Sequence, residues 1–358
     1  MRKVKLVVSD FHVGKGVFLE NGTRNPLEDF FYDAKFIEFL EYHRTGDYEN
    51  ADVELICNGD FFNHLQLDLN EKHPAWISEG VALHRMEAIL KGHPGIFEEL
   101  KHFAGIPRHR ILFMLGNHDP GLLFPSVAER LKKALGPNIA VRLTPYRFDG
   151  VHVEHGNQFF ADNAYNTGRY FLSKDLSEPI VNLPWGSYLV IYYLNPVRRE
   201  RAYFCKVYPF RYYLRWALIH DTLFALKSIL RILYYFFHLR FTRDPHRRSS
   251  FMRTIQIIFE VGLAPRLDLE AKKILLTDRS VHVVIFGHSH HAVMRQFAPG
   301  KVYLNTGVWN EQLSLEMSDP GKIVRLTYAQ LDYDEHGVPQ PSLKEGKGSH
   351  RIIEEVIA

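Results

Sequence analysis

One short stretch, Gly116-Asn117-His118-Asp119, carries three side chains that can bind a metal or move a proton, and it follows the apolar run 111–115. A run of that length ending in Gly-Asn is typical of a buried strand that stops at a tight turn. Asn and Asp offer oxygen ligands, and His offers a nitrogen ligand or a proton donor. Taken alone, the stretch is equally well interpreted as a turn after a core strand, so its meaning depends on the rest of the chain.

Four other apolar runs end in residues of the same kind. They are 4–8, followed by Ser9-Asp10-Phe11-His12; 53–57, followed by Asn58-Gly59-Asp60; 151–154, followed by His155-Gly156-Asn157; and 281–286, followed by Gly287-His288-Ser289-His290. A glycine beside such residues lets the backbone turn tightly. Because loops at the carboxyl ends of strands gather at one edge of an α/β sheet, these five loops predict one polynuclear metal site.

The residue types indicate which chemistry such a site could perform. Asp, Asn and His together suit Mn²⁺, Fe or Zn²⁺. Two divalent cations about 3.5–4 Å apart can hold a phosphoryl group and activate a water. Asp60 is the candidate bridge between the cations, and Asn117 is a neutral ligand that leaves the site enough positive charge to attract phosphate. His118 is better placed to contact the phosphate and protonate the leaving oxygen.

The five stretches resemble, in order and spacing, the signature blocks of the calcineurin-like metallophosphoesterase superfamily, over roughly residues 1–160 and 275–310. The resemblance implies an α/β fold, a four-layer α/β/β/α sandwich, with two divalent metal ions. Mn²⁺ is the first choice, with Fe or Zn²⁺ as alternatives. By this resemblance the catalytic histidine is His118. One metal would take Asp10, His12, Asp60 and His290, and the other would take Asp60, Asn117, His155 and His288.

The chain departs from one branch of that superfamily and shares features with another. Its protein phosphatases carry Asp-Arg three residues after the bridging aspartate, where this chain has Asn63-His64, which argues against a phosphoprotein substrate. Asn63 could orient His118 or be a simple turn residue, and Arg24 could bind a distal phosphate or have no role. The chain also resembles the bacterial UDP-2,3-diacylglucosamine pyrophosphohydrolases, which carry an inserted helical lid, although that family often has Arg where His118 stands.

The charge pattern divides the chain into four parts. They are residues 1–160, the first part of the core; 161–270, a largely helical insertion rich in basic and aromatic residues; 271–335, the second part of the core; and 336–358, a polar tail. Within 196–250, twelve Lys or Arg oppose three acidic residues, a net charge of +9 that leaves −6 for the rest of the chain. Lys227 and Arg231 interrupt the apolar stretch 216–239, so a membrane-spanning helix is disfavoured.

Three interpretations of the insertion remain open. It could be a helical hairpin packed on the core, or an element that lies on an anionic membrane with its aromatic run 234–237 in the headgroup region. Binding to single-stranded nucleic acid is the less favoured third. Only Cys57 and Cys205 are present and Met1 leads directly into a strand, so the expected location is cytoplasmic, peripheral on the inner membrane under the second interpretation.

The function predicted from the sequence is hydrolysis of a phosphoester or pyrophosphate by a dinuclear metal site. The expected substrate is nucleotide-linked or lipid-linked and lies at the membrane surface, UDP-2,3-diacylglucosamine being one candidate. The alternatives are a soluble nucleotide phosphodiesterase or nuclease, and an inactive metal-binding scaffold. The sequence carries no indication of the oligomeric state.

Overall fold

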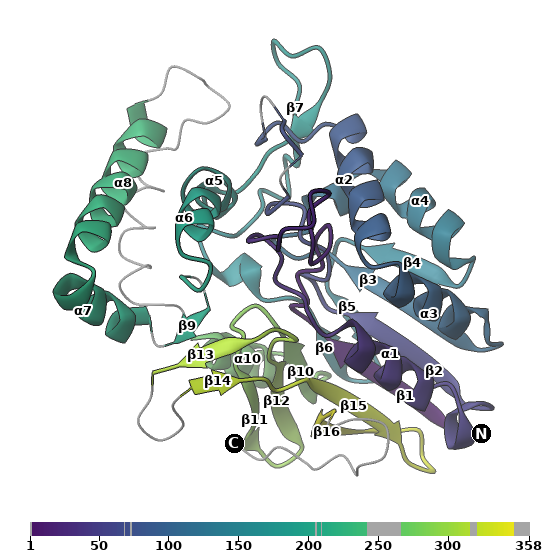
Figure 1. Ribbon diagram of the computed structural model, residues 1–358. Coiled ribbons are helices and arrows are strands. Elements are labelled where there is room, and N and C mark those ends of the chain that lie inside the picture. Colours follow the sequence, from purple (N-terminus) through teal and green to yellow (C-terminus); the bar gives the residue numbers. More distant parts are fainter. Residues whose placement is uncertain are drawn as a thin grey trace.

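The computed structural model describes residues 2–67, 69–71, 74–204, 206–208, 210–241, 266–315 and 321–346. Its larger sheet has the strand order β16-β15-β1-β2-β3-β4 (Figure 1). The strands are β1 (Lys3–Val8), β2 (Asp52–Cys57), β3 (His109–Met114), β4 (Ile139–Arg142), β15 (Thr327–Tyr333) and β16 (Pro339–Glu345). Strands β1 to β4 are parallel, whereas β15 and β16 run antiparallel to their neighbours.

A second sheet has the strand order β11-β12-β10-β6-β5. Its strands are β5 (Tyr146–Phe148), β6 (Val151–Val153), β10 (Val283–Phe286), β11 (Ala292–Ala298) and β12 (Lys301–Thr306). The three central strands are parallel, and the two outer ones are antiparallel to their neighbours. Both sheets therefore have parallel strands at their centres, and in each sheet the loops after those strands leave from one edge.

The two sheets pack against each other, and helices cover their outer faces. Val7 and Ile56 of the larger sheet share one buried cluster with Val153 and Ile285 of the smaller sheet. On the outer face of the larger sheet, residues such as Leu6 pack with the helices α1 (Asp33–Tyr42), α2 (Glu79–Gly92), α3 (Pro94–Gly105) and α4 (Pro125–Leu135). Helix α10 (Leu267–Thr277) covers the smaller sheet. The layers therefore follow the order helix, sheet, sheet, helix, in an α/β fold.

Short helices and hairpins connect these layers. The 3₁₀ turns are η1 (Gly46–Tyr48), η2 (Pro120–Leu123) and η3 (Asn157–Phe159), and β7 (Phe171–Leu172) pairs with β8 (Ile180–Val181). The insertion continues through α5 (Trp185–Leu189), η4 (Val190–Leu194), α6 (Asn195–Glu200), β9 (Val207–Tyr208), α7 (Phe210–His220) and α8 (Thr222–Phe241). Strand β9 joins β13 (Gln312–Ser314) and β14 (Gly321–Ile323) in a small third sheet, which ties the insertion to the core.

The helical run from α5 to α6 is continuous and is anchored to the core. Its middle segment, η4, is a π-helix just before Pro196, which fits the lost hydrogen bond and ring clash that a proline introduces inside a helix. The side chain of Asn195 donates to the carbonyl of Leu65 at 2.9 Å, and Arg198 forms an ion pair with Asp29. The insertion is therefore held directly above the loops that follow β1 and β2.

Two packed elements extend across boundaries expected from the sequence. Helix α10 packs on β10 from its first residue, Leu267, ahead of the boundary expected at residue 271. The polar tail expected from residue 336 does not begin there, because β16 pairs along the whole of β15 and its Leu343 is fully buried. The two prolines of this segment argue against a strand in the sequence. In the structure they are tolerated because β16 is an edge strand, whose outer N–H groups have no partner. Residues 347–358 and 242–265 lie outside the described residues.

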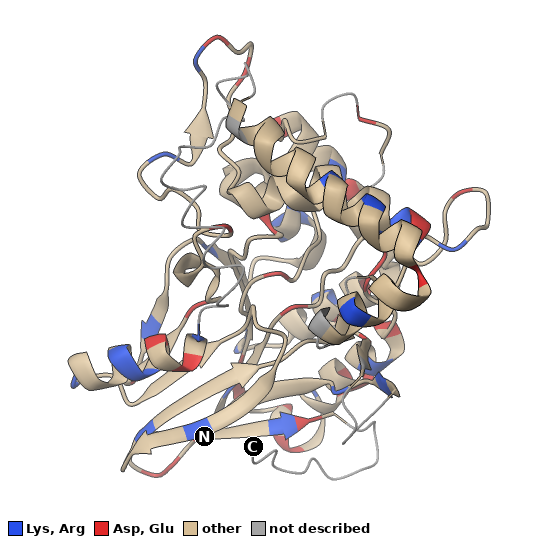
Figure 2. Ribbon diagram, turned by 90° about the vertical axis from the view of Figure 1, so that its left-hand side faces the viewer, with Lys and Arg blue, Asp and Glu red and all other residues tan. Residues whose placement is uncertain are grey.

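Helices α7 and α8 expose many apolar side chains. In Figure 2, where this side of the molecule faces the viewer, most of their ribbon is tan, which marks residues other than Lys, Arg, Asp and Glu. Leu223 is 82 % exposed, Leu230 66 % and Tyr234 69 %. Tyr235, by contrast, is buried against Trp185. Within the described residues, one window, 222–239, is long and apolar enough to cross a membrane by length and composition alone, with a mean hydropathy of 1.2 and 28 % of it buried.

Candidate metal centre

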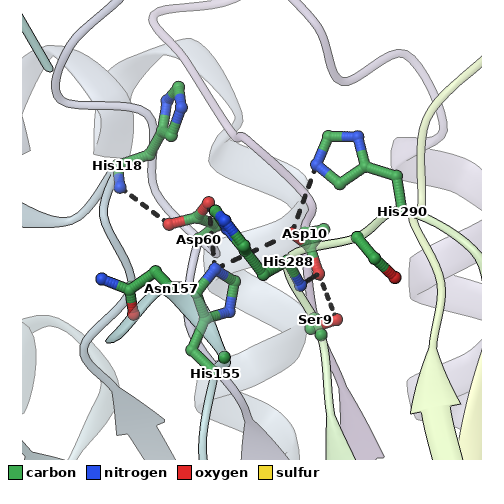
Figure 3. A network of polar contacts seen from close by, with 12 residues as sticks. Ser9, Asp10, Asp60, His118, His155, Asn157, His288 and His290 are labelled. Carbon is green, nitrogen blue, oxygen red and sulfur yellow. Dashed lines mark hydrogen bonds and ion pairs between the residues drawn. The ribbon is translucent and has the colours of Figure 1, made fainter. Parts of the chain in front are cut away.

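Five loops bring the predicted metal ligands to one place, because the strands before them end side by side. Val8, the last residue of β1, pairs with Cys57, and Cys57 pairs with Phe113 near the end of β3. In the other sheet Ile285 pairs with Val153. The loops that follow β1, β2, β3, β6 and β10 therefore meet, and their side chains converge (Figure 3).

The backbone is strained at five of the seven predicted ligands. They have positive φ angles: Asp10 57°, His12 54°, Asp60 51°, His288 65° and His290 60°. This left-handed region is disfavoured for residues with a side chain, at a cost on the order of 1–3 kcal/mol each. Strain of this kind persists only where the surrounding structure enforces it, and it clusters at functional sites.

The first group of side chains consists of Asp10, His12 and His290, whose candidate ligand atoms all lie within 4.8 Å of one another. The Nε2 atom of His290 lies 3.3 Å from Oδ1 of Asp10 and 3.4 Å from Nε2 of His12. Asp10 and His12 are buried. Two imidazole nitrogens and a carboxylate oxygen converging from separate loops fit a divalent cation.

The second group consists of Asp60, His155 and His288. The Nε2 atom of His155 lies 3.2 Å from Oδ2 of Asp60, and the same Oδ2 lies 4.0 Å from Nε2 of His12 in the first group. One Asp60 oxygen thus faces both groups, which is the position that a bridging carboxylate requires. His118 also lies within ligand reach of His12 and Asp60.

The electrostatics of these groups favour bound positive charge. Burial lowers the pKa of His155, but the carboxylates of Asp60 and Asp10 more than offset it and raise that pKa to about 10. Two fully buried carboxylates so close together call for a cation between them. The donor set of both groups fits divalent metals of intermediate hardness, including Mn²⁺, Fe and Zn²⁺.

Hydrogen bonds with neighbouring residues orient the predicted ligands. The side chain of Ser9 and the backbone N–H of His288 both donate to Oδ2 of Asp10, the latter at 3.0 Å. The Nδ1 atom of His155 lies 2.8 Å from the carbonyl of Asn58. Because a carbonyl only accepts, Nδ1 carries the proton and Nε2 is left for a metal, an arrangement typical of metal-binding histidines.

Asp119 supports the loop that carries Asp60. Its buried carboxylate accepts the backbone N–H groups of Asp60 at 2.5 Å, Phe62 at 2.8 Å and Gly116 at 3.0 Å. Gly116 packs so closely on Asp60 that a Cβ there would lie 2.2 Å from Asp60 Oδ1. The glycine in this stretch therefore permits close packing of the β3 loop on the bridge.

Asn117 and His118 follow β3. The side-chain oxygen of Asn117 is buried and accepts no hydrogen bond within the described part of the chain, which fits a neutral metal ligand. The backbone N–H of His118 donates to Oδ1 of Asp60 at 2.7 Å. The roles assigned to both residues from the sequence stay predictions.

Asn63 contacts the ring of His118. The Nδ1 atom of His118 lies 3.1 Å from the side-chain oxygen of Asn63, whose amide donates to Gln66 at 2.6 Å. The imidazole therefore carries a proton on Nδ1, which leaves Nε2 as the nitrogen that exchanges a proton with substrate. Burial lowers the pKa of His118, with the Asp60 carboxylate opposing the shift. Once protonated, His118 is therefore a stronger acid than an ordinary histidine.

A cavity of about 150 Å³ opens beside His12, His118 and His290. The insertion supplies Arg198 and Lys206 to its wall, and sequence reasoning assigned neither of them to the site. Their basic character was visible in the sequence, but none of the three interpretations of the insertion placed it at the metal centre.

Arg24, for which the sequence left open a contact with a distal phosphate or no role, is exposed. Its guanidinium lies 4.6 Å from the centre of the Phe31 ring. It does not line this cavity.

Comparisons with known proteins give the chain no family. No family model and no curated protein matches it. A conserved uncharacterized protein of Streptococcus pneumoniae TIGR4, described as a predicted phosphoesterase, aligns with a TM-score of 0.31 and 9 % identity, covering 99 % of this chain and 98 % of its own. A dimetal phosphatase of Danio rerio aligns with a TM-score of 0.37 and 11 % identity, covering 99 % and 97 %. These values are too low to bear on function, which has to be argued from the geometry of the site.

Proposed function

We propose that this protein is a metal-dependent phosphoester hydrolase with a dinuclear centre. The observation that carries the proposal is the pair of His/Asp groups that face each other across Asp60. Asp10, His12, Asp60 and His290 would hold one ion, and Asp60, Asn117, His155 and His288 would hold the other. Two such ions, when bound, neutralise phosphate charge and activate a water.

The remaining residues of the site have separate tasks. Asn63 holds the ring of His118 so that Nε2 can give a proton to the leaving oxygen. Asp119 and Gly116 fix the loop that carries Asp60, and Asn58 fixes the tautomer of His155. A metal-binding scaffold would need no oriented histidine beside its cavity, so His118 and Asn63 favour an enzyme.

Metal-dependent hydrolysis is the direct test of this proposal. We expect the purified protein to bind two divalent ions per chain and to hydrolyse at least one phosphoester or pyrophosphate with Mn²⁺, Fe²⁺ or Zn²⁺, and to lose that activity with a chelator. The panel should include p-nitrophenyl phosphate, bis-p-nitrophenyl phosphate, UDP-glucose and single-stranded DNA. Two bound metals without hydrolysis of any compound would favour the scaffold.

We also propose that the hairpin of α7 and α8 rests on an anionic membrane, which would bring a lipid-linked substrate to the site. Helix α8 carries three basic residues and no acidic one. Its outward side chains are apolar: Leu223, Leu226, Leu230, Leu233, Tyr234 and Phe237 are each about half or more exposed. Lys227 and Arg231 are paired with Glu200, so the charged stripe of the helix faces back toward α6 and the apolar stripe is left outward.

Liposome flotation tests this membrane contact. Wild type should float with vesicles containing anionic phospholipid, and the double variant Leu223→Ser with Leu230→Ser should float less at every salt concentration. Salt screens charge but leaves apolar insertion unaffected, and burying each Leu contributes roughly 1.5–3 kcal/mol.

Leu269→Ser with Leu276→Ser is the matched control, because these leucines of α10 are 50 % and 56 % exposed on the core. Wild type that ignores vesicles, or equal losses in both double variants, would contradict the proposal. Replacing Tyr235 should destabilise the fold instead, since it is buried.

A further inference from the structure

Two positively charged side chains and one negatively charged side chain meet beside the metal centre. The Asp29 carboxylate pairs with both arms of the Arg198 guanidinium, at 2.9 Å and 2.7 Å. The Nζ atom of Lys206 lies 3.8 Å from Oδ1 of the same carboxylate. All three side chains are largely buried, with exposures of 14 % for Asp29, 1 % for Arg198 and 11 % for Lys206. Within this group two buried cations share one anion, and the other acid of the cavity wall, Glu311, is ion-paired with Lys322 at 2.7 Å.

The carboxylate is committed mainly to Arg198. Burial would raise the pKa of Asp29, but Arg198 and then Lys206 lower it to about 2, so the carboxylate is ionised. Arg198 engages it through two close hydrogen bonds, the strong bidentate geometry. At 3.8 Å, Lys206 is beyond hydrogen-bond distance of it. Lys206 also lies 4.7 Å from the centre of the Phe31 ring.

Lys206 is therefore the cation in excess. Burial lowers its pKa, with Asp29 and Glu311 opposing. The carboxylates of Asp29 and Glu311 are themselves engaged by Arg198 and Lys322, so the ammonium has lost solvation and shares its counter-charges with other cations. A buried charge is stable when it is paired and hydrogen-bonded. A second anion beside Lys206 would complete that pairing, whereas Arg198 and Asp29 already suffice to anchor the insertion.

The cavity shows where that anion would come from. Lys206 and Arg198 line the same cavity as His12, His118 and His290. Besides Asp29, the other polar wall residues are Glu311, which pairs with Lys322, and the amides Gln66, Asn310 and Gln312. The amides suit phosphate oxygens as hydrogen-bond donors. With only about 150 Å³ available, a group that reaches Lys206 lies directly next to the group bound at the metal centre.

We infer that Lys206 binds a second phosphate of the substrate, adjacent to the phosphorus that is hydrolysed, so the substrate class is a pyrophosphate diester. This inference rests on the proposed function. It gives the insertion a second task besides any contact with lipid: residues from α6 and from just before β9 complete the substrate site. A phosphomonoester or a simple phosphodiester would occupy the metals and leave Lys206 incompletely paired.

The experiment measures inhibition of p-nitrophenyl phosphate hydrolysis by UDP-glucose and by UMP, which share a nucleoside and differ in their phosphates. Inhibition constants can be measured whether or not UDP-glucose is cleaved. Lys206→Met should raise the inhibition constant of UDP-glucose about 10–100-fold, the usual effect of losing a hydrogen bond to a charged group. The fold-change in the inhibition constant of UMP should be at least ten times smaller. Lys206→Arg should restore most of the difference, because it keeps the charge.

Lys227→Met is the matched control, since this lysine of the insertion pairs with Glu200 away from the cavity and should leave both constants unchanged. Equal effects of Lys206→Met on UDP-glucose and UMP, or no effect on either, would overturn the inference. Hydrolysis of p-nitrophenyl phosphate by wild type reports on the proposed function separately. If it and every other phosphoester stay intact, direct titration of the metal-loaded protein with UDP-glucose and UMP still decides the role of Lys206.

Discussion

Replacing Asp60 with Ala should abolish both hydrolysis and stoichiometric binding of two metals. Its Oδ2 faces His155 at 3.2 Å and His12 at 4.0 Å, and its Oδ1 accepts the backbone N–H of His118. One side chain therefore connects both groups and holds the loop that carries His118. Losing a partner that merely orients a ligand typically costs 10–100-fold, so losing the bridge should reduce activity by more than about 100-fold. Metal analysis of the purified variant should find at most one ion per chain.

The isosteric variant Asp60→Asn separates loss of charge from loss of shape. Asn can keep the hydrogen bond from His118 but removes one negative charge from a site that calls for cations, so it too should bind fewer than two ions. Circular dichroism should show both variants folded. Two retained ions per chain in Asp60→Ala would place the bridge elsewhere and contradict the assignment of the two groups.

The sequence predicted that the side chains of the five loops meet because the relevant information is local. A buried parallel strand has to end at the sheet edge, so Asp10, Asp60 and His288 could each be placed from the few residues before them. The same logic could not place Lys206, which follows no core strand. Its position depends on Arg198 docking onto Asp29, a tertiary contact between segments about 170 residues apart.

The insertion also shows what apolar runs leave undetermined. Under the membrane interpretation the run 234–237 enters the headgroup region. In the structure Tyr235 is buried and Phe236 packs on Trp185, while Tyr234 and Phe237 are exposed. All four residues of this run are aromatic, so their types alone give no periodic signal to identify the inner face of the helix. Only the packing partner, here Trp185 of α5, decides the orientation.

His118→Ala should slow hydrolysis by roughly 10²–10⁴-fold, the usual contribution of a positioned proton donor. The loss should depend on the leaving group. A p-nitrophenolate leaves readily without protonation, so its ester should lose least, while the ester of a poorly acidic alcohol should lose most. Measuring kcat/KM for a series of aryl and alkyl phosphoesters in wild type and variant gives this dependence directly.

Two alternatives for His118 predict different results. If it only positions phosphate, the loss should be the same for every leaving group. If it is instead a metal ligand, which its reach to His12 and Asp60 allows, His118→Ala should lower the metal content below two ions per chain. Asn63→Ala then tests the donor role by a second route, because Asn63 contacts Nδ1 of the ring and not the Nε2 that would donate the proton. Asn63→Ala should show the same leaving-group dependence as His118→Ala, with a smaller loss of kcat/KM and with both metals retained. The reason is that a released ring still carries the proton but holds it in the wrong place.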